Sequence, residues 1–143
     1  MLFRSTLAFT AYSVAWSAAW FGLRGTLAAE VVGAVVGAAA MAGLLVWGFG
    51  AGREFPRVAA ALILLNALGY FLGEVWWRWL PGEGGAQLLG AILNRPQRAM
   101  FAMLGWGVVF GGCFGAGVGY AIYRCQAAVR AKLRTGIPLK PGQ

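Results

Sequence analysis

The chain has 143 residues, of which 60% are hydrophobic and only 11% are charged. A soluble domain carries about 25% charged residues, so this composition indicates an integral membrane protein. The chain has no histidine, and its four acidic residues are all glutamate, which excludes histidine-ligated haem, the usual zinc and non-haem iron sites and a Ser-His-Asp triad.

The first predicted helix covers residues 5–23, an uncharged segment between Arg4 and Arg24. Its length suits a crossing of a hydrocarbon core of about 30 Å, although its serine and threonine residues make it only moderately apolar. A cleaved signal peptide is the alternative interpretation. Trp16 and Trp20 fit a cleavage region poorly, so we expect the segment to be retained as a membrane span.

The second predicted helix covers residues 27–49 and follows a tight turn at residues 24–26. So short a connection predicts that the first two helices are antiparallel neighbours. Gly33 and Gly37 have the four-residue spacing that lets a second helix approach closely, and we assign them to helix packing.

The third predicted helix covers residues 57–80, after a glycine-rich break with Pro56 at its end. Four polar residues recur on one face of this helix at four-residue spacing: Asn66, Tyr70, Glu74 and Arg78. Two interpretations remain open. Glu74 and Arg78 can form an interfacial ion pair, or the four residues can line a polar pathway for an ion, a proton or a small solute.

The fourth predicted helix covers residues 99–123, after a connection that includes a short amphipathic segment at residues 87–93. Asn94 and the two residues after it start this helix. One side of the helix carries a glycine every fourth residue, a set that we call the glycine stripe: Gly107, Gly111, Gly115 and Gly119.

The glycine stripe predicts close contact with another helix, because lipid does not favour the exposure of glycine. Successive members advance by about 400° of helical rotation, so the stripe winds slowly around its helix. A partner that follows it crosses right-handed at roughly −40°. The predicted partner is Gly33 and Gly37 in the same chain, with a second copy of the fourth helix as the alternative.

Four spans place both termini on one side of the membrane, and the basic residues divide unequally between the two sides. One side holds eight of them: Arg4, Arg53, Arg57, Arg124, Arg130, Lys132, Arg134 and Lys140. The other side holds four: Arg24, Arg78, Arg95 and Arg98. The positive-inside rule therefore predicts a multi-pass inner-membrane protein with both termini in the cytoplasm, and it explains the basic excess without nucleic acid.

The sequence thus predicts an all-α fold with a four-helix transmembrane domain over residues 1–125 and a basic cytoplasmic tail over residues 126–143. Four basic residues are expected to contact anionic lipid headgroups: Arg124, Arg130, Lys132 and Arg134. We expect no metal, no cofactor and no enzyme activity. The leading hypothesis is a small membrane subunit that packs with itself or with a larger complex, and the alternative is a small oligomeric transporter or channel.

Overall fold

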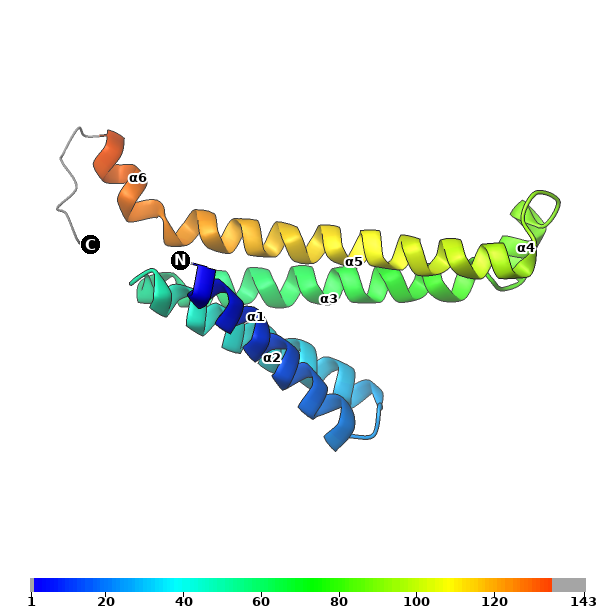
Figure 1. Cartoon of the computed structure of the whole chain (residues 1–143), viewed down its shortest axis with the longest axis horizontal. Helices are drawn as coiled ribbons and strands as arrows, with labels where there is room; N and C mark the ends of the chain where they lie inside the picture. The colour runs from blue at the N-terminus through cyan, green and yellow to red at the C-terminus, as the bar shows by residue number, and fades with distance from the viewer. Residues whose placement is uncertain (1, 135–143) are drawn as a thin grey trace. The chain divides into compact units, whose positions relative to one another are not determined.

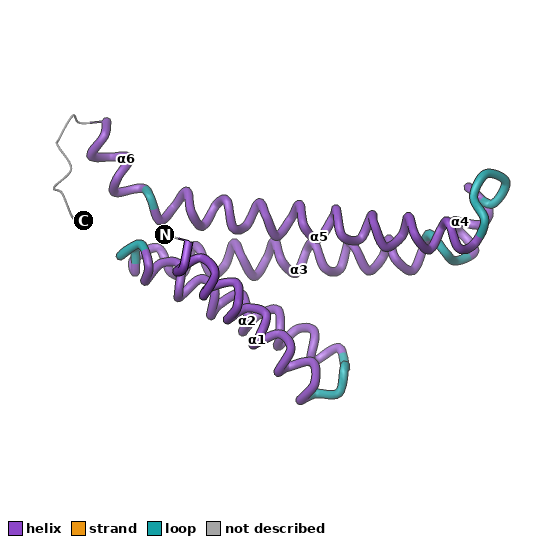
Figure 2. The backbone as a smooth tube through the Cα atoms, in the orientation of Figure 1, coloured by secondary structure: helices purple, strands orange, loops and turns teal. Residues whose placement is uncertain are grey.

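The computed structural model describes residues 2–134, and nearly all of them are helical (Figure 2). This confirms the predicted all-α fold. The predicted end of the chain from Gly136, with Lys140, lies outside the described residues, and so do the side chains of Arg4 and Lys132.

The helices follow one another along the chain with short connections (Figure 1). They are α1 (Leu2–Gly22), α2 (Leu27–Gly48), the 3₁₀ turn η1 (Gly52–Glu54), α3 (Phe55–Trp79), α4 (Glu83–Leu89), α5 (Arg95–Cys125) and α6 (Ala127–Arg134). The four long helices were all predicted, with ends that differ by a few residues. The short amphipathic segment was predicted at residues 87–93, but the short helix α4 begins earlier, at Glu83. The first part of the tail, predicted only as a basic segment, forms α6.

Three of the described helices are long and apolar enough to cross a membrane: Leu27–Gly48, Gly52–Trp79 and Arg95–Cys125. The prediction of four spans is therefore confirmed only in part. The exception is α1, which has the length of a span at 21 residues. Its hydroxyl-bearing residues make it only moderately apolar, and these include Thr6, Thr10, Ser13 and Ser17.

The described chain divides into two compact units. One unit contains the chain up to Ile63 and again from Val118, and the other contains Leu64–Gly117. The first unit therefore holds α1, α2, the start of α3, the end of α5 and α6. The second holds the rest of α3, all of α4 and most of α5.

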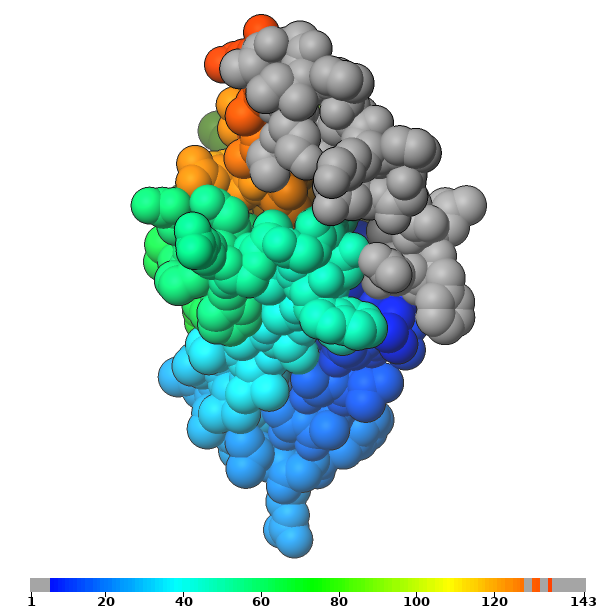
Figure 3. Space-filling model, turned by 90° about the vertical axis from the view of Figure 1, so that its left-hand side faces the viewer, coloured from blue at the N-terminus to red at the C-terminus, as the bar shows by residue number. Residues whose placement is uncertain are grey.

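In the first unit, α1 and α2 form an antiparallel hairpin and pack against each other (Figure 3). The turn between them places Arg24 and Gly25 at φ angles of 55° and 65°. The N–H of Gly25 donates to the carbonyl of Trp20 at 2.9 Å, which closes the end of α1. The hydroxyl oxygen of Thr26 then accepts from the N–H of Ala29 at 3.4 Å and caps α2. The predicted hairpin is confirmed.

Gly50 ends α2 in the left-handed region, with a φ angle of 64°. The N–H of Ala51 donates to the carbonyl of Val46 at 2.7 Å, and the N–H of Gly50 donates to that of Trp47 at 3.1 Å. These two bonds define a Schellman motif, which glycine favours because it has no Cβ. The motif stops α2 and directs the chain into η1 and α3.

In the second unit, α3 and α5 run side by side in opposite directions (Figure 1). Asn94 and Gln97 start α5 with a reciprocal pair of bonds. The side chain of Asn94 accepts from the N–H of Gln97 at 3.0 Å, and the side chain of Gln97 accepts from the N–H of Asn94 at 2.9 Å. Two N–H groups that helix geometry leaves without partners are thereby satisfied, as predicted from Asn94.

Candidate functional site

The glycines of the chain fall into two groups according to what surrounds them. A Cβ placed on Gly69 would lie 2.7 Å from Cβ of Cys113 and 3.1 Å from Cα of Phe110, so α5 approaches α3 too closely there for any side chain. A Cβ on Gly73 would lie 2.7 Å from the indole of Trp106. Gly105 of α5 receives the indole of Trp76 in the same way. These three glycines hold α3 and α5 together.

Gly33 and Gly37 perform the same function between α2 and α1. A Cβ on Gly33 would lie 3.1 Å from the indole of Trp16, and a Cβ on Gly37 would lie 3.0 Å from the ring of Tyr12 and 3.1 Å from its carbonyl oxygen. Their predicted assignment to close packing is consistent with these contacts. It is α1, however, and not the glycine stripe, that occupies the surface at these two positions.

The glycine stripe has no such neighbours. A Cβ on Gly107, Gly111, Gly115 or Gly119 would meet no atom within 4 Å among the described residues of its own unit. All four glycines are exposed. The residues of α5 that contact α3 include Trp106, Phe110 and Cys113, and by helical rotation Gly111 lies on roughly the opposite side of α5 from them. The stripe therefore faces away from α3.

The four residues of the polar face of α3 lie in different surroundings. Nε of Arg78 donates to Oε1 of Glu74 at 2.7 Å, which is the ion pair of the first interpretation. Asn66 is buried, with 1% of its surface exposed. Tyr70 makes an edge-to-face contact with Trp106, with ring centroids 6.1 Å apart. The four residues thus have three different environments.

A hollow of about 240 Å³ opens beside this face, and Glu74 is the one member of the polar face that lines it. The other lining residues are Trp77, Met103 and Trp106. A carboxylate with two indoles and a thioether is a chemical environment suited to an organic cation, since indole faces attract positive charge. No sequence pattern indicates the contributions of α5 to this hollow, because they come from a helix that is distant along the chain.

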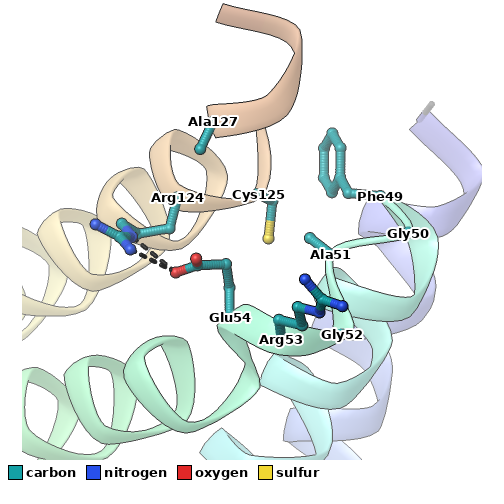
Figure 4. Close-up of a pocket in the computed structure, with 9 residues that line it drawn as sticks. All are labelled: Phe49, Gly50, Ala51, Gly52, Arg53, Glu54, Arg124, Cys125 and Ala127. Atoms are coloured by element: carbon teal, nitrogen blue, oxygen red, sulfur yellow. Dashed lines mark hydrogen bonds and ion pairs between the residues drawn. The ribbon is translucent and has the colours of Figure 1, made fainter. Parts of the chain in front are cut away.

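A second polar cluster joins the turn after α2 to the end of α5, and its residues are all in the first unit (Figure 4). Nη2 and Nε of Arg124 lie 2.7 Å and 2.9 Å from Oε2 of Glu54. Nη1 of Arg57 lies 3.4 Å from the other oxygen of Glu54. The carboxylate of Glu54 therefore binds two guanidinium groups. It connects the turn before α3 to the end of α5, which are 70 residues apart along the chain.

This cluster borders a hollow of about 270 Å³, into which Cys125 points (Figure 4). Cys125 is buried and Cys113 lies against Gly69, and both thiols are free. Both cysteines occupy positions where a small side chain fits. Sequence reasoning missed the pair of Glu54 and Arg124. A signal that could have found it is the assignment of Arg53 and Arg124 to the same side of the membrane, because Glu54 directly follows Arg53.

Of the basic residues predicted to contact lipid headgroups, Arg124 is engaged by Glu54, and Arg130 lies over the ring of Tyr123 with its guanidinium carbon 3.6 Å from the ring centroid. Arg130 and Arg134 line a hollow of about 400 Å³. The side chain of Lys132 lies outside the described residues. The structure thus brings two of these four residues together at one hollow.

Arg98 was predicted only as one of the basic residues on the side opposite the termini, yet it is buried, with 8% of its surface exposed. Its Nη1 donates to the carbonyl of Leu93 at 2.8 Å, which ties the start of α5 to the turn after α4. Its Nε has no hydrogen-bond partner among the residues that the structure describes. Nothing in the sequence distinguishes this arginine from its exposed neighbour Arg95.

The chain has no significant match among protein-family models, curated proteins or solved structures.

Proposed function

We propose that this chain is a small, non-catalytic integral membrane subunit, and that the glycine stripe of α5 is the surface through which it packs with a second copy or with a larger membrane complex. The observation that carries the proposal is the contrast among the glycines. Gly69, Gly73 and Gly105 are covered by side chains of their own unit, whereas the stripe is open. In lipid, an open line of glycines lets the backbone of another helix approach closely, which gains van der Waals contact over several turns.

The proposal includes four membrane spans, with α1 as the first. α1 packs against α2 along Gly33 and Gly37. If α2 crosses the membrane, we expect its antiparallel neighbour α1 to cross the membrane beside it. Hydroxyl groups within a span need partners inside the helix. The hydroxyl of Thr10 donates to the carbonyl of Thr6 at 2.9 Å, which satisfies it without water.

The proposed orientation places both termini in the cytoplasm of a cell with an inner membrane. Its support is the division of basic residues, eight on the proposed cytoplasmic side and four on the other. The pair of Glu54 and Arg124 is consistent with placing the loop before α3 and the end of α5 on the same side of the membrane.

The orientation is tested with reporter fusions after Gly52, in the segment 82–85 and at Gln143. We expect cytoplasmic signals from the first and the last, and an external signal from the segment 82–85. A cytoplasmic signal from the segment 82–85 would contradict both the four spans and their direction.

The packing function is tested by purification of the full chain in a mild detergent, followed by native mass spectrometry. We expect a defined homo-oligomer or a stable complex with another membrane protein, because the stripe requires a partner. A purely monomeric chain that retains its helical content and co-purifies with no membrane protein would contradict the proposal.

A second candidate function rests on the hollow beside Glu74, with its two indoles and its carboxylate. In this alternative, the chain is a small oligomeric transporter or channel in which Glu74 receives a cationic solute or a proton. Glu74→Gln is the test in liposomes, because it keeps the shape of the side chain and removes its charge. This alternative predicts loss of a pH-dependent flux from a folded variant, and an unchanged flux would reject it.

A further inference from the structure

We propose that the hollow beside α6 is a discrete binding site for the phosphate of an anionic phospholipid, with Arg130, Arg134 and Tyr123 as its recognition residues. The inference rests on the proposed membrane location with a cytoplasmic tail. It goes further, because it replaces a general attraction of basic residues to the membrane surface with one site, one ligand class and a geometry.

The hollow has a volume of about 400 Å³ and is lined by Tyr123, Ala127, Arg130, Ala131 and Arg134. The last four follow one another at intervals of three, one and three, so they lie on one face of α6. Tyr123 lies at the end of α5, before the break at Gln126, and joins them through its contact with Arg130. Two small alanines on that face leave room between the aromatic ring and the two guanidinium groups.

The orientation of Arg130 is fixed by Tyr123. Its guanidinium carbon lies 3.6 Å from the centroid of the tyrosine ring, a cation–π contact. A guanidinium group that stacks through its face keeps the N–H donors at its edge available. Those donors can bind phosphate oxygens in the bidentate geometry for which arginine is better suited than lysine.

Among the described residues, no carboxylate forms an ion pair with the cations of the hollow. The chain has only four carboxylate side chains, at Glu30, Glu54, Glu74 and Glu83. Within the first unit, Glu54 is engaged by Arg124 and Arg57. Glu30 is in the first turn of α2, about 30 Å along that helix from the turn at Gly50. Among the described residues, no ion pair includes Arg130 or Arg134. A bound anion would relieve the repulsion between these two cations.

The position of the hollow favours a lipid over a free anion. Tyr123 is the last residue of the predicted span 99–123, and Arg124 begins the basic segment. The hollow therefore starts at the boundary between the apolar span and the polar tail, which is the depth of the headgroup phosphates. The alanines and the tyrosine ring offer an apolar surface to the glycerol part of a lipid.

The test is native mass spectrometry of the full chain in mild detergent, titrated with phosphatidylglycerol or with zwitterionic phosphatidylcholine. We expect one tightly retained phosphatidylglycerol per chain. Arg130→Gln should weaken its retention about tenfold, because it removes a charge-assisted bidentate contact. Arg53→Gln is the matched control, since it removes one positive charge from the same side of the membrane and should change retention less than about twofold.

Variants of Tyr123 distinguish a specific binding site from diffuse attraction to a basic surface. Tyr123→Phe keeps the ring under Arg130 and should retain the lipid, whereas Tyr123→Leu removes the ring and should weaken retention. Equal weakening by Arg130→Gln and Arg53→Gln would overturn the proposal in favour of diffuse attraction. Equal retention of phosphatidylcholine, or thermal stabilisation by inorganic phosphate as large as that by phosphatidylglycerol, would overturn the assignment to an anionic lipid.

The same spectra separate this inference from the proposed function, because they report oligomer mass and bound lipid together. An oligomer that retains no phosphatidylglycerol would overturn the lipid site alone. A monomer that retains phosphatidylglycerol selectively would contradict the packing function and leave the lipid site in place.

Discussion

The two sides of α5 use glycine for different purposes. On the side that faces α3, Gly105 receives the indole of Trp76, and Trp106 and Cys113 approach glycines of α3. On the other side, the stripe has the same lack of side chains but no neighbour in its own unit. A glycine of these helices thus either contacts a neighbouring helix of its own unit or remains open. Only for the open glycines do we propose a partner helix.

The α1–α2 hairpin belongs to the first kind. Gly33 and Gly37 lie against Trp16 and Tyr12, in the way that Gly73 lies against Trp106. In both cases an aromatic residue on one helix matches a glycine on its neighbour. The glycine stripe has no matching aromatic residue among the described residues of its own unit, which is why substitutions on the two kinds of glycine should give opposite results.

The largest effect is expected for Gly69→Leu. The new side chain would overlap Cβ of Cys113 and the backbone of Phe110, so α3 and α5 would have to separate. Overpacking of this kind costs about 1–3 kcal/mol, and contact with backbone places this variant at the upper end of the range. Thermal unfolding in detergent measures the loss. Gly112→Leu is the control, because a Cβ there meets nothing within 4 Å. Equal melting temperatures for the two variants would refute the close approach.

A smaller destabilisation is expected for Gly37→Leu. A Cβ at this position would lie 3.0 Å from the ring of Tyr12, which can rotate, and 3.1 Å from its carbonyl oxygen, which cannot move without the backbone. We expect a loss of about 1–2 kcal/mol, measured in the same way. Gly43→Leu serves as the control on the same helix, since its nearest neighbour, Phe55, is at an ordinary contact distance of 3.9 Å. A Gly37→Leu variant as stable as Gly43→Leu would argue against the hairpin packing.

Glu54→Gln should lower the melting temperature by less than either glycine variant. It removes the charge that holds Arg124 and Arg57, while the amide keeps the shape of the side chain. Glu83→Gln is the matched control, because Glu83 is exposed and forms no ion pair among the described residues. The difference between the two variants should shrink at high salt, since salt screens the pair. A difference that does not depend on salt would show that Glu54 contributes through packing instead.

The smallest effect is expected for Arg24→Gly. Arg24 has a φ angle of 55°, a conformation that costs a residue with a Cβ about 1 kcal/mol and costs glycine nothing. Glycine also has more freedom in the unfolded chain, so we expect a net stabilisation of at most about 0.5 kcal/mol. Thermal unfolding checks the sign. A clear loss of stability would mean that the side chain of Arg24 makes a contact that outweighs the strain.

The sequence predicted most of the fold because local signals mark the helix ends. Asn94 starts α5, Gly50 stops α2, and Pro56 lies in the first turn of α3, each for a reason contained within a few residues. It did not predict α6, because composition marked the tail as basic and polar rather than as a helix.

The candidate sites were harder to predict, because their residues are distant in sequence. The pair of Glu54 and Arg124 spans 70 residues, and no local spacing predicts it. The four-residue spacing of glycines is the same in Gly69 and Gly73, which α5 covers, and in the open stripe. Periodicity therefore finds glycine faces but cannot tell which of them the chain itself covers.

The structure also guides the choice of a control for the stripe. Gly84 lies in α4 with the indole of Trp79 beside it, so it is not an open glycine. A substitution there would disturb packing as well. Gly22 is the better comparison for the stripe, because it is equally open and lies on another helix, at the end of α1.

The most direct measurement is the oligomeric mass of Gly111→Leu beside that of Gly22→Leu, in the same mild detergent and at the same protein concentration. Both leucines enter open space in their own unit, so both variants should keep the helical content and melting temperature of the isolated chain. We predict that Gly111→Leu separates the chain from its partner copy or complex, whereas Gly22→Leu leaves the assembly intact. If both variants keep the mass of the unmodified assembly, the stripe faces lipid, and the central claim that it is a helix-packing surface is wrong.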